Sequence, residues 1–208
     1  MALRLVMMGT GSFALPTFQG LLESEHQVTG LFTQPDRVGK GHHHHVNPLK
    51  DAALARGVPV FQPAKVNTPE ALAELRALQA DVFVVAAYGQ ILSDELLRIP
   101  RLGAFNVHAS LLPKYRGAAP IQYAVLNGET ETGITIFRIE PKLDAGPILA
   151  VAETPIGSEE TAGELEERLA DIAVELVKGV LRDIERGTAL GIPQDAAKAT
   201  RAPHIRKE

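Results

Sequence analysis

The chain has 208 residues, of which 45% are hydrophobic and 22% are charged, so its length and composition suit one generously sized globular domain. Its formal net charge is -4, so any contact with nucleic acid must come from a local basic patch. It has no cysteine, which excludes disulfides, a thiol nucleophile and cysteine-ligated metal sites. No apolar run approaches the roughly 20 residues of a membrane helix, so we expect a cytoplasmic protein that contacts no membrane.

Apolar strand-like runs alternate with amphipathic stretches along the chain. The expected strands are residues 3–8, 28–33, 58–61, 81–87, 103–108 and 133–139. Continuous apolar strands imply burial on both faces, and therefore a mostly parallel sheet covered by helices. The alternation predicts an α/β fold of the Rossmann-like, doubly wound type, with helices on both faces of the sheet.

The longest expected helix follows Thr161, which forms a capping box with Glu164. Apolar residues then repeat at spacings of three and four, and Gly187 supplies the glycine that commonly ends a helix. A second N-cap is expected at Thr68, which precedes Pro69. Beyond Gly187 the apolar period fades, so we divide the chain into a main domain at residues 1–187 and a linker or tail at residues 188–208.

A glycine loop follows the first expected strand. Residues 9–14 read Gly-Thr-Gly-Ser-Phe-Ala, which matches the dinucleotide fingerprint, and Asp36 lies about 20 residues further on, as that fingerprint asks. An NAD-dependent oxidoreductase is therefore one alternative. Against it, Asp36 follows a proline beyond the strand, whereas the ribose-binding acid belongs at the strand's end. The backbone N–H groups of such a loop can also bind another anion, such as a phosphate.

Two polar residues, Asn106 and His108, close the fifth expected strand. The period of two places both side chains on one face, at the strand end where α/β sheets bind ligands. An amide donor beside an imidazole suits the stabilisation of an oxyanion. The alternative is that both side chains satisfy backbone groups of the loop. Ser110 lacks the Gly-x-Ser-x-Gly turn of a Ser–His hydrolase.

A lone acid, Asp144, lies further on in the sequence Leu-Asp-Ala-Gly-Pro. Aspartate before small residues and proline is common in turns, so a turn residue is the alternative to a catalytic one.

Residues 106–129, Thr132-Gly133 and the Leu-Asp-Ala-Gly run at residues 143–146 together resemble the formyltransferase family. The resemblance extends over about residues 3–187, which it implies are a formyltransferase catalytic domain. Three further stretches, residues 9–14, 33–41 and 59–63, are most similar to the family members that formylate methionyl-tRNA. The resemblance implies 10-formyltetrahydrofolate as co-substrate, initiator methionyl-tRNA as acceptor, no metal, and a monomer.

The family's site residues carry over by position, and each role here is implied by the resemblance. The catalytic residues are Asn106, His108 and Asp144. The folate-binding residues are Ser110, Leu111, Leu112, Pro113, Gly89, Gln90, Ile91 and Leu92. The residues facing the acceptor tRNA are Gly9, Gly11, Ser12, Phe13, Arg37, Lys40, His42, Lys114 and Arg116.

The expected chemistry is acyl transfer between two nitrogens. Asn106 and a protonated His108 stabilise the oxyanion, Asp144 raises the pKa of His108, and Asp144 takes the proton of the amine. Formyl transfer to a small amine or to water is the alternative within the family, and a module that only binds folate or RNA is another.

The tract of four histidines at residues 42–45 replaces most of the lysine and arginine of the family's tRNA-facing loop. Neutral histidine attracts phosphate less, so the tract leaves open an RNA-facing loop, a solvated loop or an adventitious metal site. The family's tRNA enzymes add a C-terminal barrel domain, and we expect that this chain lacks it.

Overall fold

The computed structural model describes residues 1–37 and 46–207. It divides into two compact units, residues 1–104 and 105–208, which are treated separately below. Among the described residues, no helix is both long enough and apolar enough to cross a membrane.

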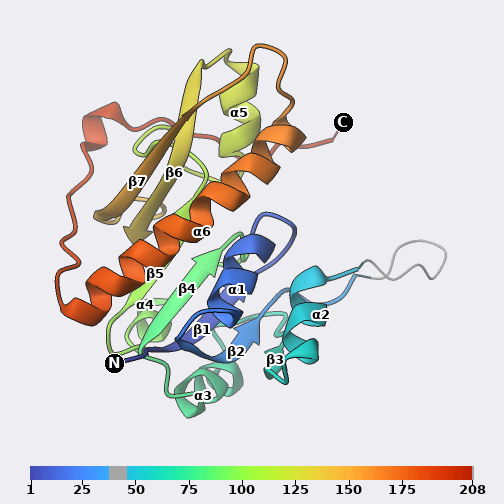
Figure 1. The fold of residues 1–208 in the computed structure, drawn as a ribbon, viewed down its shortest axis with the longest axis vertical. Helices are drawn as coiled ribbons and strands as arrows, with labels where there is room; N and C mark the ends of the chain where they lie inside the picture. Colours follow the sequence, from blue (N-terminus) through green and yellow to red (C-terminus); the bar gives the residue numbers. More distant parts are fainter. Residues whose placement is uncertain (38–45, 208) are drawn as a thin grey trace. The chain divides into compact units, whose positions relative to one another are not determined.

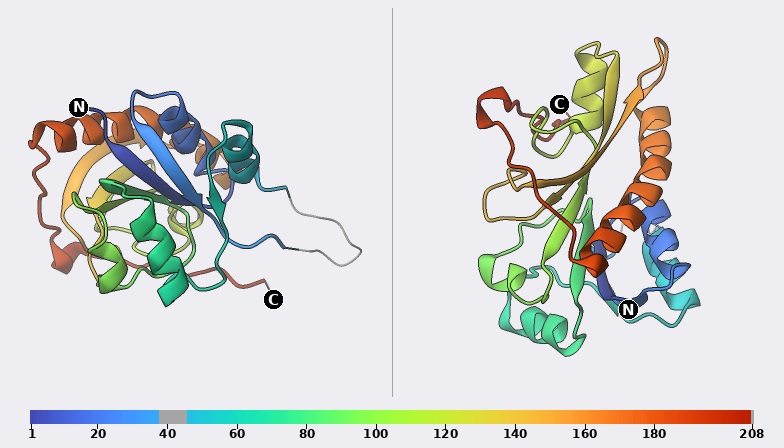
Figure 2. Two further views of the ribbon diagram at one scale, coloured as in Figure 1. Left: turned by 90° about the horizontal axis from the view of Figure 1, so that it is seen from below. Right: turned by 60° about the vertical axis from the view of Figure 1, so that its left-hand side comes forward.

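The first unit contains a parallel sheet in the order β3-β2-β1-β4. Its strands are β1 (Arg4–Gly9), β2 (Gln27–Phe32), β3 (Val60–Phe61) and β4 (Val82–Ala86). Its helices are α1 (Leu15–Leu22), α2 (Pro48–Ala55), α3 (Pro69–Ala77) and α4 (Asp94–Leu97). Figure 1 labels these elements, and Figure 2 shows α1 and α2 on one side of the sheet with α3 and α4 on the other. Right-handed crossovers give this placement, because the strand order reverses at β1.

That reversal makes the β1–β4 pair the topological switch point of the first unit, where open α/β sheets bind ligands. The loops that follow the two strands are joined there by a hydrogen bond from Thr10 N to Ala87 O at 3.1 Å. Gly9 is required at the end of β1, because a Cβ atom would lie 2.8 Å from the carbonyl oxygen of Ala86. The glycine loop and the residues after β4 therefore lie side by side.

The second unit contains antiparallel strands in the order β5-β6-β7. Its elements are β5 (Ala104–His108), α5 (Pro120–Leu126), β6 (Glu131–Arg138), β7 (Ile148–Pro155), α6 (Ala162–Arg186) and the 3-10 turn η1 (Ala196–Lys198). Helix α6 lies against β6 and β7 (Figure 1). Its buried face is the expected one, and it includes Leu165, Leu169, Ala173, Val177, Val180, Leu181 and Ile184.

The expected helix ends are confirmed. Thr161 accepts a hydrogen bond from Glu164 N, Thr68 accepts one from Ala71 N, and Gly187 ends α6 at φ 71°. The Rossmann-like α/β class is confirmed as well. Strand β7 was not expected from the sequence, because most of its residues are only partly buried and its pattern of apolar residues is weak.

Between residues 188 and 207, η1 is the only helix or strand, yet this stretch returns along the second unit (Figure 2). Ala202 is fully buried with Tyr115 and Ala124 in a small apolar cluster. The segment expected as a linker or tail is therefore packed at several points against the second unit.

Candidate active site

Three catalytic candidates lie in the second unit. Asn106 and His108 are on β5 and pair with Phe137 and Thr135 of β6, so both side chains lie on one face of the sheet. Asp144 lies in the turn between β6 and β7, with a positive φ of 49°. His108 Nδ1 lies 3.9 Å from Oδ2 of Asp144, and both side chains are buried. The structure therefore brings His108 and Asp144 together from positions 36 residues apart in the sequence.

Each member of the pair is also held by a backbone group. His108 Nε2 lies 2.9 Å from the carbonyl oxygen of Tyr115. Because a carbonyl oxygen only accepts, Nε2 carries hydrogen and the neutral ring presents the lone pair of Nδ1 toward Asp144. Asp144 Oδ2 accepts a hydrogen bond from Gly117 N at 2.7 Å. The ring and the carboxylate are thus oriented before any ligand binds.

Asp144 raises the pKa of His108 as expected, but the expectation of a protonated His108 is wrong, because the net shift of its pKa is downward. Burial lowers the pKa of His108, and it outweighs the opposing effects of the Asp144 charge and the Tyr115 carbonyl. Desolvation penalises the imidazolium more than one carboxylate at 3.9 Å stabilises it. Burial therefore favours the neutral form of His108 in the free chain.

Asn106 differs from His108 in having a side chain that makes no hydrogen bond to any residue that the structure describes. It is half-buried at the end of β5. The suggestion that both side chains satisfy loop backbone groups thus fits His108 and fails for Asn106. A free amide beside a buried acid–base pair is the arrangement that an oxyanion needs.

The loop at residues 110–113 is held from β6. Thr135 Oγ1 donates to Ser110 O at 2.6 Å and accepts from Leu112 N at 3.1 Å. Ser110 Oγ in turn donates to Lys114 O at 2.6 Å, and Ser110 and Leu112 are buried. The side chains of Leu111 and Pro113 are half-buried, so less apolar surface is exposed in this loop than its sequence suggests.

The remaining folate candidates, residues 89–92, follow β4 in the first unit. The Gln90 side chain is fully engaged: its Oε1 accepts from Val66 N, and its Nε2 donates to Pro63 O and to Gln34 Oε1. Ile91 is 77% exposed, whereas Leu92 is buried. Gln90 therefore shapes the loop, and the Ile91 side chain is its exposed apolar surface.

Four acceptor candidates of the first unit belong to the glycine loop: Gly9, Gly11, Ser12 and Phe13. A hollow of about 160 Å³ is lined there by residues that include Gly11, Gln34 and Arg37. Ser12 is exposed and Phe13 is buried in the core. Lys40 and the histidines at residues 42–45 lie outside the described residues. Of the candidates in the second unit, Lys114 is exposed, and Arg116 donates to Gln194 Oε1 through Nη2 at 2.9 Å.

The dinucleotide alternative required a free carboxylate at Asp36. Its Oδ2 pairs with Lys50 Nζ at 2.7 Å, and its Oδ1 accepts from Gln62 Nε2 at 2.8 Å. Both oxygens are engaged by the protein, so this carboxylate is poorly placed to accept the hydroxyls of a ribose.

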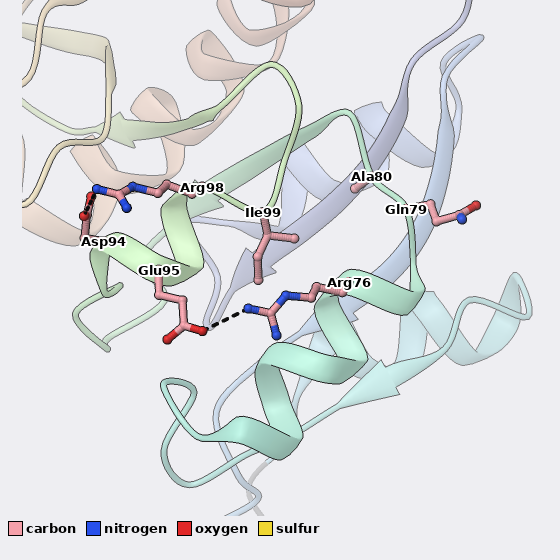
Figure 3. A pocket seen from close by; sticks show the side chains of 7 residues that line it. All are labelled: Arg76, Gln79, Ala80, Asp94, Glu95, Arg98 and Ile99. Atoms are coloured by element: carbon pink, nitrogen blue, oxygen red, sulfur yellow. Dashed lines mark hydrogen bonds and ion pairs between the residues drawn. The ribbon is translucent and has the colours of Figure 1, made fainter.

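A larger hollow of about 500 Å³ lies between α3 and α4 (Figure 3). Its charged side chains are exposed and pair with each other, Arg76 with Glu95 and Arg98 with Asp94. It holds no buried acid or base, so it lacks the features of a catalytic centre.

Comparison with known proteins shows the family of the chain. The family model for formyl transferase matches residues 3–181. The chain is similar to a methionyl-tRNA formyltransferase of Synechococcus sp. (strain JA-2-3B'a(2-13)), with 50% identity over 99% of this chain and 65% of that protein. The chain belongs to the formyl transferase family, and it spans about 65% of the length of that relative.

Solved structures show the same fold. Glycinamide ribonucleotide transformylase 1 from Geobacillus kaustophilus is 27% identical, with a TM-score of 0.72 over 88% of this chain and 98% of that chain. An N-formyltransferase from Helicobacter canadensis, in complex with folinic acid and dTDP-3-aminofucose, has a TM-score of 0.74 at 21% identity. The match covers 98% of this chain and 71% of the Helicobacter canadensis chain.

Sequence reasoning missed four residues around the site: Thr135, Gly117, Gln194 and Thr200. Thr135 holds the loop at residues 110–113, and Gly117 donates to Asp144. Gln194 and Thr200 lie in the segment expected as a linker or tail. Gly117 lies inside the family motif at residues 106–129 without an assigned role. No local pattern marks the other three, because their roles depend on contacts between residues far apart in the chain.

Proposed function

We propose that this protein transfers a formyl group from 10-formyltetrahydrofolate to the α-amine of initiator methionyl-tRNA in the cytoplasm, a step of translation initiation. The observation that carries the chemistry is the buried His108–Asp144 pair at the end of β5, beside the free amide of Asn106. The acceptor is supported by the similarity to the Synechococcus enzyme over 99% of this chain.

The folate candidates of the two units are considered separately. The loop at residues 110–113 follows β5 directly and is held rigidly by Thr135, so it can present half-buried apolar side chains beside Asn106 and His108. Ile91 offers an exposed apolar side chain after β4, at the switch point of the first unit. The folinic acid in the Helicobacter canadensis structure supports a folate donor for this fold.

The candidate residues have two tasks in the reaction: one stabilises the developing oxyanion, and the others move a proton. The Asn106 amide donates to the formyl oxygen as the amine nitrogen bonds to the formyl carbon, and such a donor is typically worth about 3 kcal/mol. The His108–Asp144 pair accepts the proton of the attacking nitrogen, leaving an imidazolium against a carboxylate. The pair then returns that proton to the folate nitrogen as its bond to the formyl carbon breaks. No covalent intermediate is needed.

The acceptor enters this scheme as a free amine. An α-amino group has a reference pKa of about 8, so a useful fraction is neutral at pH 7. Exposed Lys114 and Arg37 provide positive charge for the phosphates of tRNA, and we propose the same role for Lys40 and His42.

The direct test is to incubate the protein with 10-formyltetrahydrofolate and methionyl-tRNA and to measure N-formylmethionyl-tRNA. Asp144→Asn keeps the size of the side chain and removes its charge, so we expect product formation to fall about 10²–10⁴-fold. Asp171→Asn is the matched control, because Asp171 is an exposed aspartate on α6. It should keep the rate of the unmodified protein.

Two results would contradict the proposal. Equal rates for Asp144→Asn and the unmodified protein would remove Asp144 from the chemistry. Consumption of 10-formyltetrahydrofolate without N-formylmethionyl-tRNA, in the presence of glycinamide ribonucleotide, a sugar amine or water alone, would identify a different formyl acceptor.

A further inference from the structure

The segment at residues 192–202, called the returning segment below, runs past both catalytic loops of the second unit. It begins at Ile192, which exchanges two backbone hydrogen bonds of 2.8 Å with Ile148 at the start of β7. It ends at Ala202, whose N donates to Arg116 O at 2.7 Å and whose O accepts from Ala119 N at 3.0 Å. Both ends are thus fixed by backbone hydrogen bonds.

Gln194 joins the returning segment to the turn that carries Asp144. Its Nε2 donates to the carbonyl oxygens of Asp144 at 2.9 Å and Gly146 at 2.8 Å. Its Oε1 accepts from Arg116 through Nη2 at 2.9 Å and Nε at 3.3 Å. The half-buried amide therefore uses both of its N–H groups and both lone pairs, which is the full capacity of a glutamine side chain.

The turn needs such support because its backbone is strained. Asp144 has a positive φ of 49°, a region that costs a non-glycine residue free energy and persists only where neighbours enforce it. Leu143 beside it is 64% exposed, so apolar packing at that residue does little to hold the turn. The amide of Gln194 spans Asp144 and Gly146 and fixes the direction in which the carboxylate leaves the backbone.

Thr200 acts in the same way on the other catalytic residue. Its Oγ1 accepts from Tyr115 N at 2.9 Å, its N donates to Pro113 O, and its O accepts from Arg116 N. Tyr115 also has a positive φ, of 61°, and its carbonyl oxygen holds Nε2 of His108. Thr200 thus supports the backbone that orients the imidazole.

We infer that two residues of the returning segment are positioning residues for the reaction, Gln194 for Asp144 and Thr200 for His108. One short segment holds both members of the pair, each through a strained backbone position. The catalytic assay of this inference rests on the proposed function, whereas its spectroscopic test does not.

The experiment compares Gln194→Ala and Gln194→Glu with Asp195→Ala. Gln194→Glu keeps an acceptor for Arg116 and loses both N–H donors to the Asp144 turn. It therefore tests the contact with the turn separately from the contact with Arg116. Asp195→Ala is the matched control, because its Oδ1 only caps η1 within the same segment. Measured quantities are kcat, the KM for 10-formyltetrahydrofolate, the Kd for folinic acid, and the His108 ring resonances through a pH titration.

Both Gln194 variants should lower kcat about 10–100-fold, with the KM and the Kd for folinic acid changed less than about twofold. The His108 resonances should shift and titrate at lower pH, because the Asp144 charge that supports the imidazolium is no longer held beside it. Thr200→Val should also shift these resonances. Asp195→Ala should change none of these quantities.

The inference is overturned if both Gln194 variants keep kcat within about threefold, or if Asp195→Ala loses as much. If the unmodified protein does not formylate methionyl-tRNA, the proposed function fails, and the His108 titration still decides the positioning role. Unchanged His108 resonances in Gln194→Glu would then refute it. If Gln194→Ala does not fold, Gln194→Glu and Thr200→Val carry the same comparison.

Discussion

Nδ1 of His108 faces Oδ2 of Asp144 across 3.9 Å, while Nε2 of the same ring is held by a backbone carbonyl oxygen at 2.9 Å. The ring therefore has one fixed nitrogen and one nitrogen open to a proton, and the open one faces a carboxylate. Because burial keeps the ring neutral in the free chain, the pair has room for one proton. That is the capacity that the proposed transfer between two nitrogens requires.

The neutral, buried state of His108 predicts a pH dependence of stability. Its pKa is about 6.5 in the unfolded chain and lower in the folded one. Between the two values only the unfolded chain binds the proton. The contribution of His108 to the free energy of unfolding is thus fully present above pH 6.5. As the pH falls below 6.5, this contribution decreases by up to about 1.4 kcal/mol per pH unit. Chemical denaturation at pH 7.5, 6.5 and 5.5 measures it.

The variant that checks this stability change is His108→Gln, which should flatten the curve between pH 7.5 and 5.5. His204→Gln is the control, because His204 is exposed and should leave the curve unchanged. A stability that rises as the pH falls through this range would mean that the Asp144 charge outweighs burial, and it would restore a raised pKa for His108.

A second prediction concerns Gly117, whose φ of +124° suits only glycine. A Cβ atom there would lie 2.6 Å from Ala202 O, and Gly117 N donates to Asp144. Gly117→Ala should cost about 1–3 kcal/mol of stability and at least tenfold in kcat. Gly128→Ala is the control, since Gly128 also has a positive φ but open space. Equal kcat in the two variants would show that strain alone, without the Asp144 contact, explains the effect.

Much of this architecture could be predicted from local signals. The caps of α6, its buried face and the expected strands follow from spacing and capping residues. The motif around Asn106 supplied the candidates His108 and Asp144, which the structure brings together. Strand β7 could not be predicted, because seven of its eight residues are half-buried or exposed and its pattern of apolar residues is weak. Gln194 lies 50 residues from Asp144 in the chain, so only the folded structure shows that they touch.

The prediction of a protonated His108 was wrong for a related reason. An acidic neighbour could be inferred from the motif, and its charge does raise the pKa. The depth of burial could not be inferred from sequence, because it depends on packing from β6 and from residues 110–117. Phe137 contacts the ring edge-on at 6.3 Å between centroids, which is one part of that packing. Desolvation is therefore the reason why the net shift in the pKa of His108 is downward.

A third prediction tests the loop after β4. Gln90→Met removes the amide that accepts a hydrogen bond from Val66 N and donates to Pro63 O and Gln34 Oε1. The loop should loosen, so we expect the Kd for folinic acid to rise about tenfold, with a loss of about 1–3 kcal/mol in stability. Gln19→Met, on the exposed face of α1, should leave folinic acid binding unchanged. Isothermal calorimetry measures the Kd for folinic acid in both variants. Unchanged binding in Gln90→Met would show that this loop is not part of the folate site.

The last prediction concerns Thr135 of β6, which is fully buried and holds the loop at residues 110–113 through two hydrogen bonds. Thr135→Val keeps the shape and leaves Ser110 O and Leu112 N without that partner, at a cost of about 1–3 kcal/mol. Because this loop follows Asn106 and His108 directly, the KM for 10-formyltetrahydrofolate should rise at least fivefold while kcat changes less. Thr132→Val on the same strand is the control. An unchanged KM in Thr135→Val, despite the lost stability, would mean that the loop contributes to the fold and not to donor binding.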